Sequence, residues 1–239
     1  MNHSRVVAIC RPTSVRRLAT LCGLVITFMA VFLAGSPARA QALPPAVSLA
    51  TLTNSGASLL VGDKLFTDFS IQGSFGAGQV TVDPIQLDGN YGIEFQGGFL
   101  ADGSGADMIL KYDVAVTNSP NLIAAANLGF NGFVPFGTGV ASVVESVYTN
   151  SGSFYGEMAV YATATSSQLT NSLAIVPPQQ LLELSKDVTV SAQLPAFAEI
   201  STIDQTFSQV PEPSVLVLTI MGAAGLGLTM RRRPKRRDC

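Results

Sequence analysis

The strongest constraint on the fold is an alternation of apolar and polar residues that recurs along most of the chain. In Met108–Thr117 apolar side chains occupy every second position, and Lys186–Leu194 repeats the pattern. A period of two residues places these side chains on one face of a β-strand and their neighbours on the other. Turn residues separate further predicted strands at 58–61, 64–71, 79–83, 91–99, 121–130, 139–149, 154–165 and 198–207.

These segments predict an all-β fold, an antiparallel β-sandwich with a jelly-roll-like arrangement of its two sheets. Helical periodicity is nearly absent, and only residues 178–185 fit a short helix and a strand equally well. We expect one β-sandwich ectodomain at 58–207, preceded by a leader at 41–57. Residues from about 205 to 213 are expected to form a short flexible stalk, because they are mostly polar.

Residues 1–40 have the layout of a secretory signal peptide. Arginines without acids precede an apolar stretch at 18–34, and Ala38 and Ala40 offer small side chains for cleavage before Gln41. An N-terminal membrane anchor is the alternative, but this cleavage site follows the apolar stretch directly. Arg16 and Arg17 also suggest twin-arginine export, yet the residues after them lack the expected aromatic and lysine. We therefore expect ordinary unfolded export through signal peptidase and the general export machinery.

The C-terminal segment, 208–239, has three ordered parts. Pro211 and Pro213 flank Glu212 and hold it extended, since proline does not continue a helix. The uncharged run 214–230 is long enough for a single transmembrane helix, and its small residues allow close approach of another helix. A basic tail at 231–237 follows and predicts a cytoplasmic stop, formed by Arg231, Arg232, Arg233, Lys235, Arg236 and Arg237.

This order resembles the PEP-CTERM sorting signal. The resemblance implies handling by an exosortase, a membrane-embedded cysteine protease or transpeptidase, in a Gram-negative bacterium that produces exopolysaccharide. It implies a precursor anchored in the inner membrane and a processed protein at the cell surface or in the extracellular matrix. Two body segments, Leu60–Phe69 and Asp107–Val114, also resemble strands that recur in PEP-CTERM ectodomains. That second resemblance implies no activity.

Charge and reactive side chains exclude several functions for the body. Within 41–209, three lysines face fourteen acidic residues, a formal charge of −11, which opposes nucleic-acid binding. Cys10, Cys22, Cys239 and His3 all lie in the terminal segments that processing would remove. The processed body therefore lacks the residues for a Ser-His-Asp or Cys-His site and for an ordinary zinc site. We expect no cofactor.

Three weaker patterns remain as candidate sites. Asp102 and Asp107 share a glycine-rich turn that could supply oxygen ligands for Ca²⁺, although Asp and Gly also favour turns on their own. The pairs Asp63 with Asp68 and Asp83 with Asp88 are similar. Three glutamates on predicted strands could pair as a glycosidase acid and base: Glu94, Glu145 and Glu157. Five tyrosines could stack against sugars or pack in the core: Tyr91, Tyr112, Tyr148, Tyr155 and Tyr161.

The sequence thus predicts an exported, non-enzymatic β-sandwich that is structural or binds a ligand such as exopolysaccharide. The alternative is a carboxylate-dependent hydrolase that acts on extracellular polysaccharide. The two differ in geometry, because a hydrolase needs two carboxyl groups about 5 to 9 Å apart in a cleft.

Overall fold

Two antiparallel sheets make up the described part of the chain, which in this computed structural model comprises residues 42–117 and 120–211. The predicted signal peptide, transmembrane helix and basic tail lie outside these residues. No helix within 42–117 or 120–211 is both long and apolar enough to cross a membrane.

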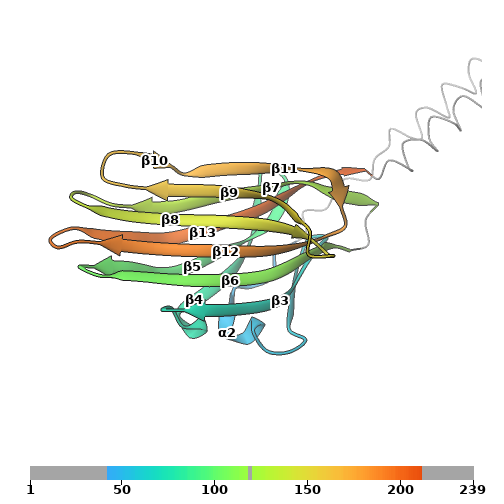
Figure 1. The fold of residues 1–239 in the computed structure, drawn as a ribbon. Helices are drawn as coiled ribbons and strands as arrows, with labels where there is room; N and C mark the ends of the chain where they lie inside the picture. Colours follow the sequence, from blue (N-terminus) through green and yellow to red (C-terminus); the bar gives the residue numbers. More distant parts are fainter. Residues whose placement is uncertain (1–41, 118–119, 212–239) are drawn as a thin grey trace, which may run out of the picture. The chain divides into compact units, whose positions relative to one another are not determined.

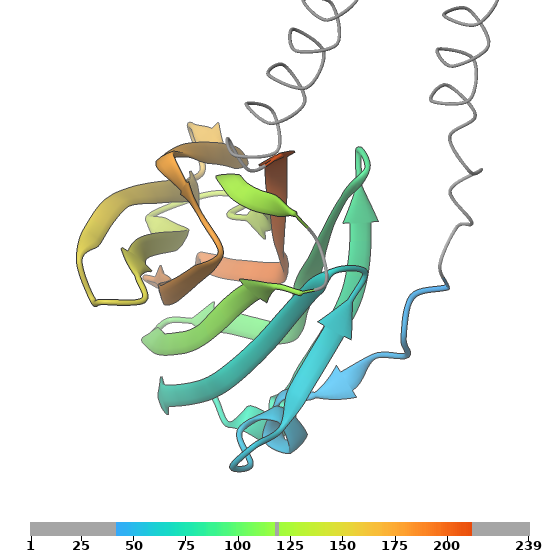
Figure 2. The ribbon, with the colours of Figure 1, turned by 90° about the vertical axis from the view of Figure 1, so that its right-hand side faces the viewer.

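The chain crosses several times between the two layers, and some consecutive strands stay within one layer (Figure 1). The six-stranded sheet has the order β1 (Val47–Ser48), β4 (Val80–Leu87), β5 (Asn90–Asp102), β13 (Phe197–Pro211), β7 (Asn121–Phe133) and β11 (Thr170–Gln179). The seven-stranded sheet has the order β10 (Ser167–Gln168), β9 (Phe154–Ala162), β8 (Gly139–Thr149), β12 (Leu181–Ala192), β6 (Gly105–Val116), β3 (Lys64–Gly73) and β2 (Ser58–Val61). Figure 2, at right angles to the first view, shows the strands twisting around a common interior.

Alternate residues of both sheets fill this interior, as the two-residue period requires. Tyr112 of β6 lies near its centre, with ring centroids 5.6 Å from Phe95 of β5 and 6.2 Å from Phe66 of β3. Phe207 of β13 extends the cluster from the opposite sheet. The prediction of an all-β antiparallel sandwich is therefore confirmed.

Three details of the strand prediction are resolved or corrected by the structure. Residues 178–185 are extended: Pro178 and Gln179 end β11, and β12 begins at Leu181. β11 itself was not predicted, because Pro177 and Pro178 interrupt its pattern; prolines fit there because β11 is an edge strand. The expectation that the alternation continues to Leu194 is wrong, since β12 ends at Ala192 and Leu194 is 75% exposed.

The segments expected to be irregular at both ends of the body are partly ordered. The leader contains β1 and a single helical turn, α2 (Leu49–Leu52), whose first turn is capped by the Ser48 hydroxyl. The flexible stalk predicted at about 205–213 is wrong for its described part, because β13 continues to Pro211 and pairs there with Asn121 of β7. The sandwich therefore reaches Pro211, the first proline of the predicted sorting motif.

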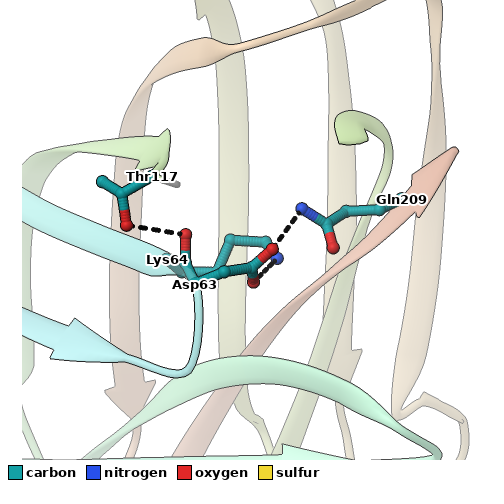
Figure 3. Close-up of polar contacts among 4 residues, drawn as sticks. All are labelled: Asp63, Lys64, Thr117 and Gln209. Carbon is teal, nitrogen blue, oxygen red and sulfur yellow. Dashed lines mark hydrogen bonds and ion pairs between the residues drawn. The ribbon is translucent and has the colours of Figure 1, made fainter. Parts of the chain in front are cut away.

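A polar cluster holds this end of β13 in place (Figure 3). Asp63, in the two-residue turn between β2 and β3, accepts a hydrogen bond from Gln209 of β13 at 2.9 Å and pairs with Lys64 at 2.7 Å. Its backbone carbonyl accepts from the Thr117 backbone at 2.8 Å and from the Thr117 hydroxyl at 3.3 Å. Burial lowers the pKa of Lys64, and Asp63 opposes that shift. The cluster joins three segments that are far apart in sequence.

Candidate functional site

One row of outward-facing side chains crosses four adjacent strands of the seven-stranded sheet, near one end of these strands. Asp113 of β6 is paired with Glu183 of β12, Glu183 with Tyr148 of β8, and Tyr148 with Phe154 of β9. These strands lie side by side in the nearer layer of Figure 1. Cross-strand partners on one face have Cβ atoms about 5 Å apart, so the row is continuous.

This row borders a hollow of about 460 Å³ on the sheet surface. Asp113, Glu183 and Tyr148 line it, together with Lys111 and Asp68. Lys111 lies two residues before Asp113 on β6, so it points to the same side of the sheet and brings a positive charge beside the carboxyl groups. Asp68 comes from a bulge in β3 and has a positive φ of 56°, which turns it out of the ladder.

The ionisation of Asp113 depends on its surroundings in the hollow. Burial, followed by the negative charges of Glu183 and Asp68, raises the pKa of Asp113 to about 6. Asp113 can therefore donate a hydrogen bond as an acid below that pH and accept one as a carboxylate above it. Both states suit a ligand with hydroxyl groups.

An aromatic surface continues the row on one side. The rings of Tyr148 and Phe154 meet edge to face with centroids 5.6 Å apart, and Phe154 is 60% exposed. Aromatic rings beside carboxyl groups provide an apolar contact together with hydrogen-bond partners. We call the hollow and its row, formed by Lys111, Asp113, Tyr148, Phe154 and Glu183, the tyrosine–carboxylate face.

A second polar region lies on the outer side of the six-stranded sheet. Asp83 of β4, Glu94 of β5 and Asp204 of β13 occupy paired positions, and Gln96 donates to Asp83 at 2.8 Å and to Glu94 at 2.6 Å. Burial and then the neighbouring Glu94 raise the pKa of Asp204 to about 6. The adjoining hollow, of about 550 Å³, has no aromatic residue among those that line it. The tyrosine–carboxylate face is therefore the stronger candidate.

The glutamates expected to pair as acid and base are not brought together. Glu94 is on the outer side of the six-stranded sheet, Glu145 of β8 is fully buried between the sheets, and Glu157 of β9 is exposed on the seven-stranded sheet. That pairing is wrong, because the strands carry these residues to different layers and different faces. The structure pairs Asp113 with Glu183 instead.

The tyrosines divide between core and surface. Tyr112 is buried, and Tyr91 packs against the core beside Gly62. The Tyr155 hydroxyl donates to the Pro177 carbonyl at 2.5 Å and accepts from Gln179, so it joins β9 to β11. Tyr148 lines the hollow, and Tyr161 lies farther along β9.

The candidate calcium ligands diverge. Asp102 ends β5 opposite Phe197, whereas Asp107 belongs to β6 in the other sheet and accepts a hydrogen bond from the Ser74 hydroxyl at 3.5 Å. Within 42–117 and 120–211, no three acidic, histidine or cysteine side chains are grouped so that they could hold a metal ion. The carboxylate of Asp63 already forms an ion pair with Lys64 and accepts a hydrogen bond from Gln209.

The residues predicted to serve in sorting and signal cleavage lie almost entirely outside the described part of the chain. Only Pro211, the last residue of β13, falls within it. Ala38, Ala40, Gln41, Glu212, Pro213 and the basic tail fall outside.

The tyrosine–carboxylate face contains residues that the sequence did not single out, chiefly Asp113 and Glu183. Each stands at a polar position in an alternating segment, which places it on the outer side of a strand. Their proximity depends on the register between β6 and β12, which are separated by more than sixty residues. Local patterns contain no information on that register.

Comparison with known proteins gives only distant similarity. No protein-family model matches the chain, and no curated protein matches it. Among solved structures, the carbohydrate-binding module TmCBM27, described with specific mannan recognition, is 11% identical, with 70% of this chain and 98% of that chain covered and a TM-score of 0.30. The module TmCBM61 in complex with beta-1,4-galactotriose is 13% identical over 60% and 88%, with a TM-score of 0.29. These similarities assign neither a ligand nor an activity to this chain.

Proposed function

We propose that the domain is a non-enzymatic polysaccharide-binding module of an exported protein, with a jelly-roll-like strand order. The observation that carries the proposal is the position of Tyr148 beside the carboxyl pair Asp113 and Glu183 in one hollow. A sugar ring has an apolar C–H face and a rim of hydroxyl groups. Tyr148 and Phe154 suit the first, and the carboxyl groups and Lys111 suit the second.

The open sheet surface favours a polymer over a small molecule. The row from Asp113 to Phe154 runs across four adjacent strands, which lie about 4.8 Å apart. A chain of several sugar units laid along this row would meet the carboxyl pair and the aromatic pair in succession. The net negative charge of the body favours a neutral polymer.

Electrophoresis through native gels that contain a soluble polysaccharide tests this function, with galactan, mannan, xylan and the exopolysaccharide of the native host as probes. We expect at least one polymer to retard the protein. Tyr148→Ala should abolish the retardation, whereas Tyr161→Ala, on the same sheet but away from the hollow, should leave it unchanged. If no polymer retards the protein, or if both variants behave alike, the tyrosine–carboxylate face is not a polysaccharide site.

A hydrolase remains the second candidate because of the same carboxyl pair. Asp113, with its pKa raised to about 6, suits a general acid, and Glu183 lies directly opposite on the next strand, where cross-strand Cβ atoms are about 5 Å apart. Release of reducing sugar from a polymer that binds would favour this candidate. In that case, Glu183→Gln should remove turnover but keep binding, whereas a pure binding module shows no turnover in either protein.

We also propose that the chain is delivered to the cell surface or matrix as an exosortase substrate. The support is the order of Pro211, Glu212 and Pro213 before the apolar run 214–230 and the basic tail, with a signal peptide at 1–40. β13 extends to Pro211, so little free chain would separate the domain from the motif. The membrane would hold the precursor until it is cut.

Cell fractionation in the native host, with a tag inserted in an exposed loop, tests the sorting proposal. Replacing Pro211, Glu212 and Pro213 with alanine should leave export intact and trap an uncut precursor in the inner membrane. Replacing Arg231, Arg232 and Arg233 with alanine should instead disturb orientation or retention. Trimming and surface delivery of the triple-alanine motif variant at the level of the parent would show that the tail is an ordinary anchor.

A further inference from the structure

Three polar side chains meet in the core, where all three are fully buried. Lys186 of β12 forms an ion pair with Glu145 of β8, its cross-strand neighbour. The Lys186 ammonium also donates to the side-chain carbonyl of Gln205 of β13 at 2.6 Å. β12 and β13 belong to different sheets, so the contact between Lys186 and Gln205 spans the sandwich.

The surroundings of this triad are apolar and leave several of its polar atoms without partners. Lys186 Nζ lies 6.0 Å from the centroid of the Tyr112 ring, and Phe66, Phe95 and Phe207 pack around that ring or its neighbours. Gln205 Nε2 has no hydrogen-bond partner among the described residues. An unpaired carboxamide nitrogen in an apolar core is costly, and no described residue holds this nitrogen by a hydrogen bond.

The position of the amine suits an attack on the carboxamide. Nζ is 2.6 Å from Gln205 Oε1, and a C=O bond is about 1.23 Å long, so Nζ lies within about 3.8 Å of the carbonyl carbon. Burial lowers the pKa of Lys186 well below its usual value, which favours the neutral, nucleophilic amine. Glu145 is in contact with the amine and can take its proton.

We propose that Lys186 and Gln205 join in an intramolecular isopeptide bond, with Glu145 as the proton carrier. Glu145 first takes a proton from the Lys186 ammonium. Nζ then bonds to Cδ of Gln205, and the protonated Glu145 gives its proton to the departing amide nitrogen, which leaves as ammonia. The new bond releases a second proton from Nζ to Glu145. No oxidant, reductant or further reactant is needed.

The product suits the core better than the starting groups. The reaction converts a buried ammonium and a buried carboxylate into a neutral amide and a neutral carboxylic acid. The triad then carries no buried charge. Gln205 is the acyl donor, since its neutral carbonyl is polarised by the hydrogen bond from Lys186. A carboxylate such as Glu145 is a poor electrophile and is needed as the base. The bond would join β12 covalently to β13 and close the segment 186–205 into a ring.

Mass spectrometry of the full chain decides the question. Trypsin does not cut after a modified lysine, so Lys186 and Gln205 should stay in one peptide that begins at Tyr112. We expect this peptide to be lighter than its sequence by one ammonia, with fragment ions that place the link between Lys186 and Gln205. Unmodified masses, with cleavage after Lys186, would overturn the proposal. Loss of one water with a link to Glu145 would also overturn it, because the acyl donor would then be different.

Variants separate the roles of the three residues. Gln205→Met keeps a similar side-chain length but removes the carboxamide, so ammonia loss should vanish. Glu145→Gln should likewise leave Lys186 unmodified, since the proton carrier is lost. Gln193→Met changes an exposed glutamine in the loop between β12 and β13 and should retain full ammonia loss. Should the core variants fail to accumulate, the mass of the parent protein still decides the matter.

Discussion

Asp113 on β6 lies directly opposite Glu183 on β12, so two carboxyl groups face one hollow from neighbouring strands. Folding partly buries Asp113 and brings it beside Glu183, and burial followed by this neighbouring charge raises the pKa of Asp113. The pair therefore links the stability of the sandwich to pH as well as shaping the proposed binding face.

Asp113→Asn should make the protein more stable in neutral solution but not in acid. The pKa of Asp113 is about 6 in the folded state and 3.8 as the ordinary value, so the folded state binds the proton more tightly. The stabilisation that this proton brings is complete below about pH 4 and is lost as pH rises through about 6. Because the group is only partly buried, we expect a modest gain of about 1 kcal/mol at pH 7.5 and none at pH 4.

Urea unfolding of the parent and Asp113→Asn proteins at both pH values measures this difference. Asp187→Asn, an exposed acid on β12, is the control and should change little at either pH. An equal effect of Asp113→Asn at pH 4 and pH 7.5 would contradict the linkage.

Tyr112→Phe should not destabilise the domain, although Tyr112 is fully buried. Its hydroxyl has no hydrogen-bond partner among the described residues, so its removal relieves an unpaired polar group. We expect the free energy of unfolding to stay the same or to rise by about 1 kcal/mol. Tyr155→Phe, which loses the bond to Pro177, should instead lower it by about 1 kcal/mol. Thermal unfolding of both variants, followed by far-UV circular dichroism, makes the comparison.

Gly62→Ala should be far more damaging than an ordinary turn substitution. Gly62 has a positive φ of 62°, and a Cβ atom there would overlap the ring of Tyr91. Gly56 has a φ of 77° but open space around it, so Gly56→Ala tests the backbone effect alone. We expect losses of about 3 kcal/mol and about 1 kcal/mol respectively. Equal losses in chemical denaturation would mean that Tyr91 moves aside freely.

Asp63→Ala should loosen the end of β13 as well as the turn that contains it. It removes the partner of Lys64, which is 1% exposed, and the acceptor for Gln209. We expect a loss of about 2 kcal/mol and faster amide hydrogen exchange near Val210. Gln209→Ala removes only one hydrogen bond, so it should accelerate exchange at the same place with a smaller loss of stability. Unchanged exchange in both variants would show that the ladder with β7 alone holds this end.

The sequence was sufficient for the fold class and for most strand positions, because alternation is a local property. For Lys186, the alternating pattern predicts the direction of the side chain but not its partner. Lys186 stands in phase with Val188 and Val190, so its inward direction follows from the two-residue period. That it meets Gln205 across the sandwich depends on how the sheets are stacked, which no short segment encodes. The pairing of Asp113 with Glu183 was not predicted for a similar reason, because it depends on the register between two distant strands.

Errors in the prediction arose where tertiary pairing outweighed local composition. Residues 205–211 are mostly polar and resembled a stalk, yet β13 lies between β5 and β7, and pairing with β7 keeps them extended. Pro177 and Pro178 hid β11, because prolines usually end strands but are tolerated at a sheet edge. In both cases hydrogen bonding to β7 keeps the segment in an extended conformation that its local composition does not predict.

The position of β13 has a mechanical consequence for a protein held by its C-terminus. β13 is an inner strand, hydrogen-bonded to β5 on one side and to β7 on the other, and it ends at Pro211. Tension entering at that end pulls along the strand axis, so many hydrogen bonds on both sides resist it together. An edge strand would instead be peeled away one bond at a time. Under the proposed C-terminal attachment, an external load would therefore act first on an inner strand that is hydrogen-bonded along both edges.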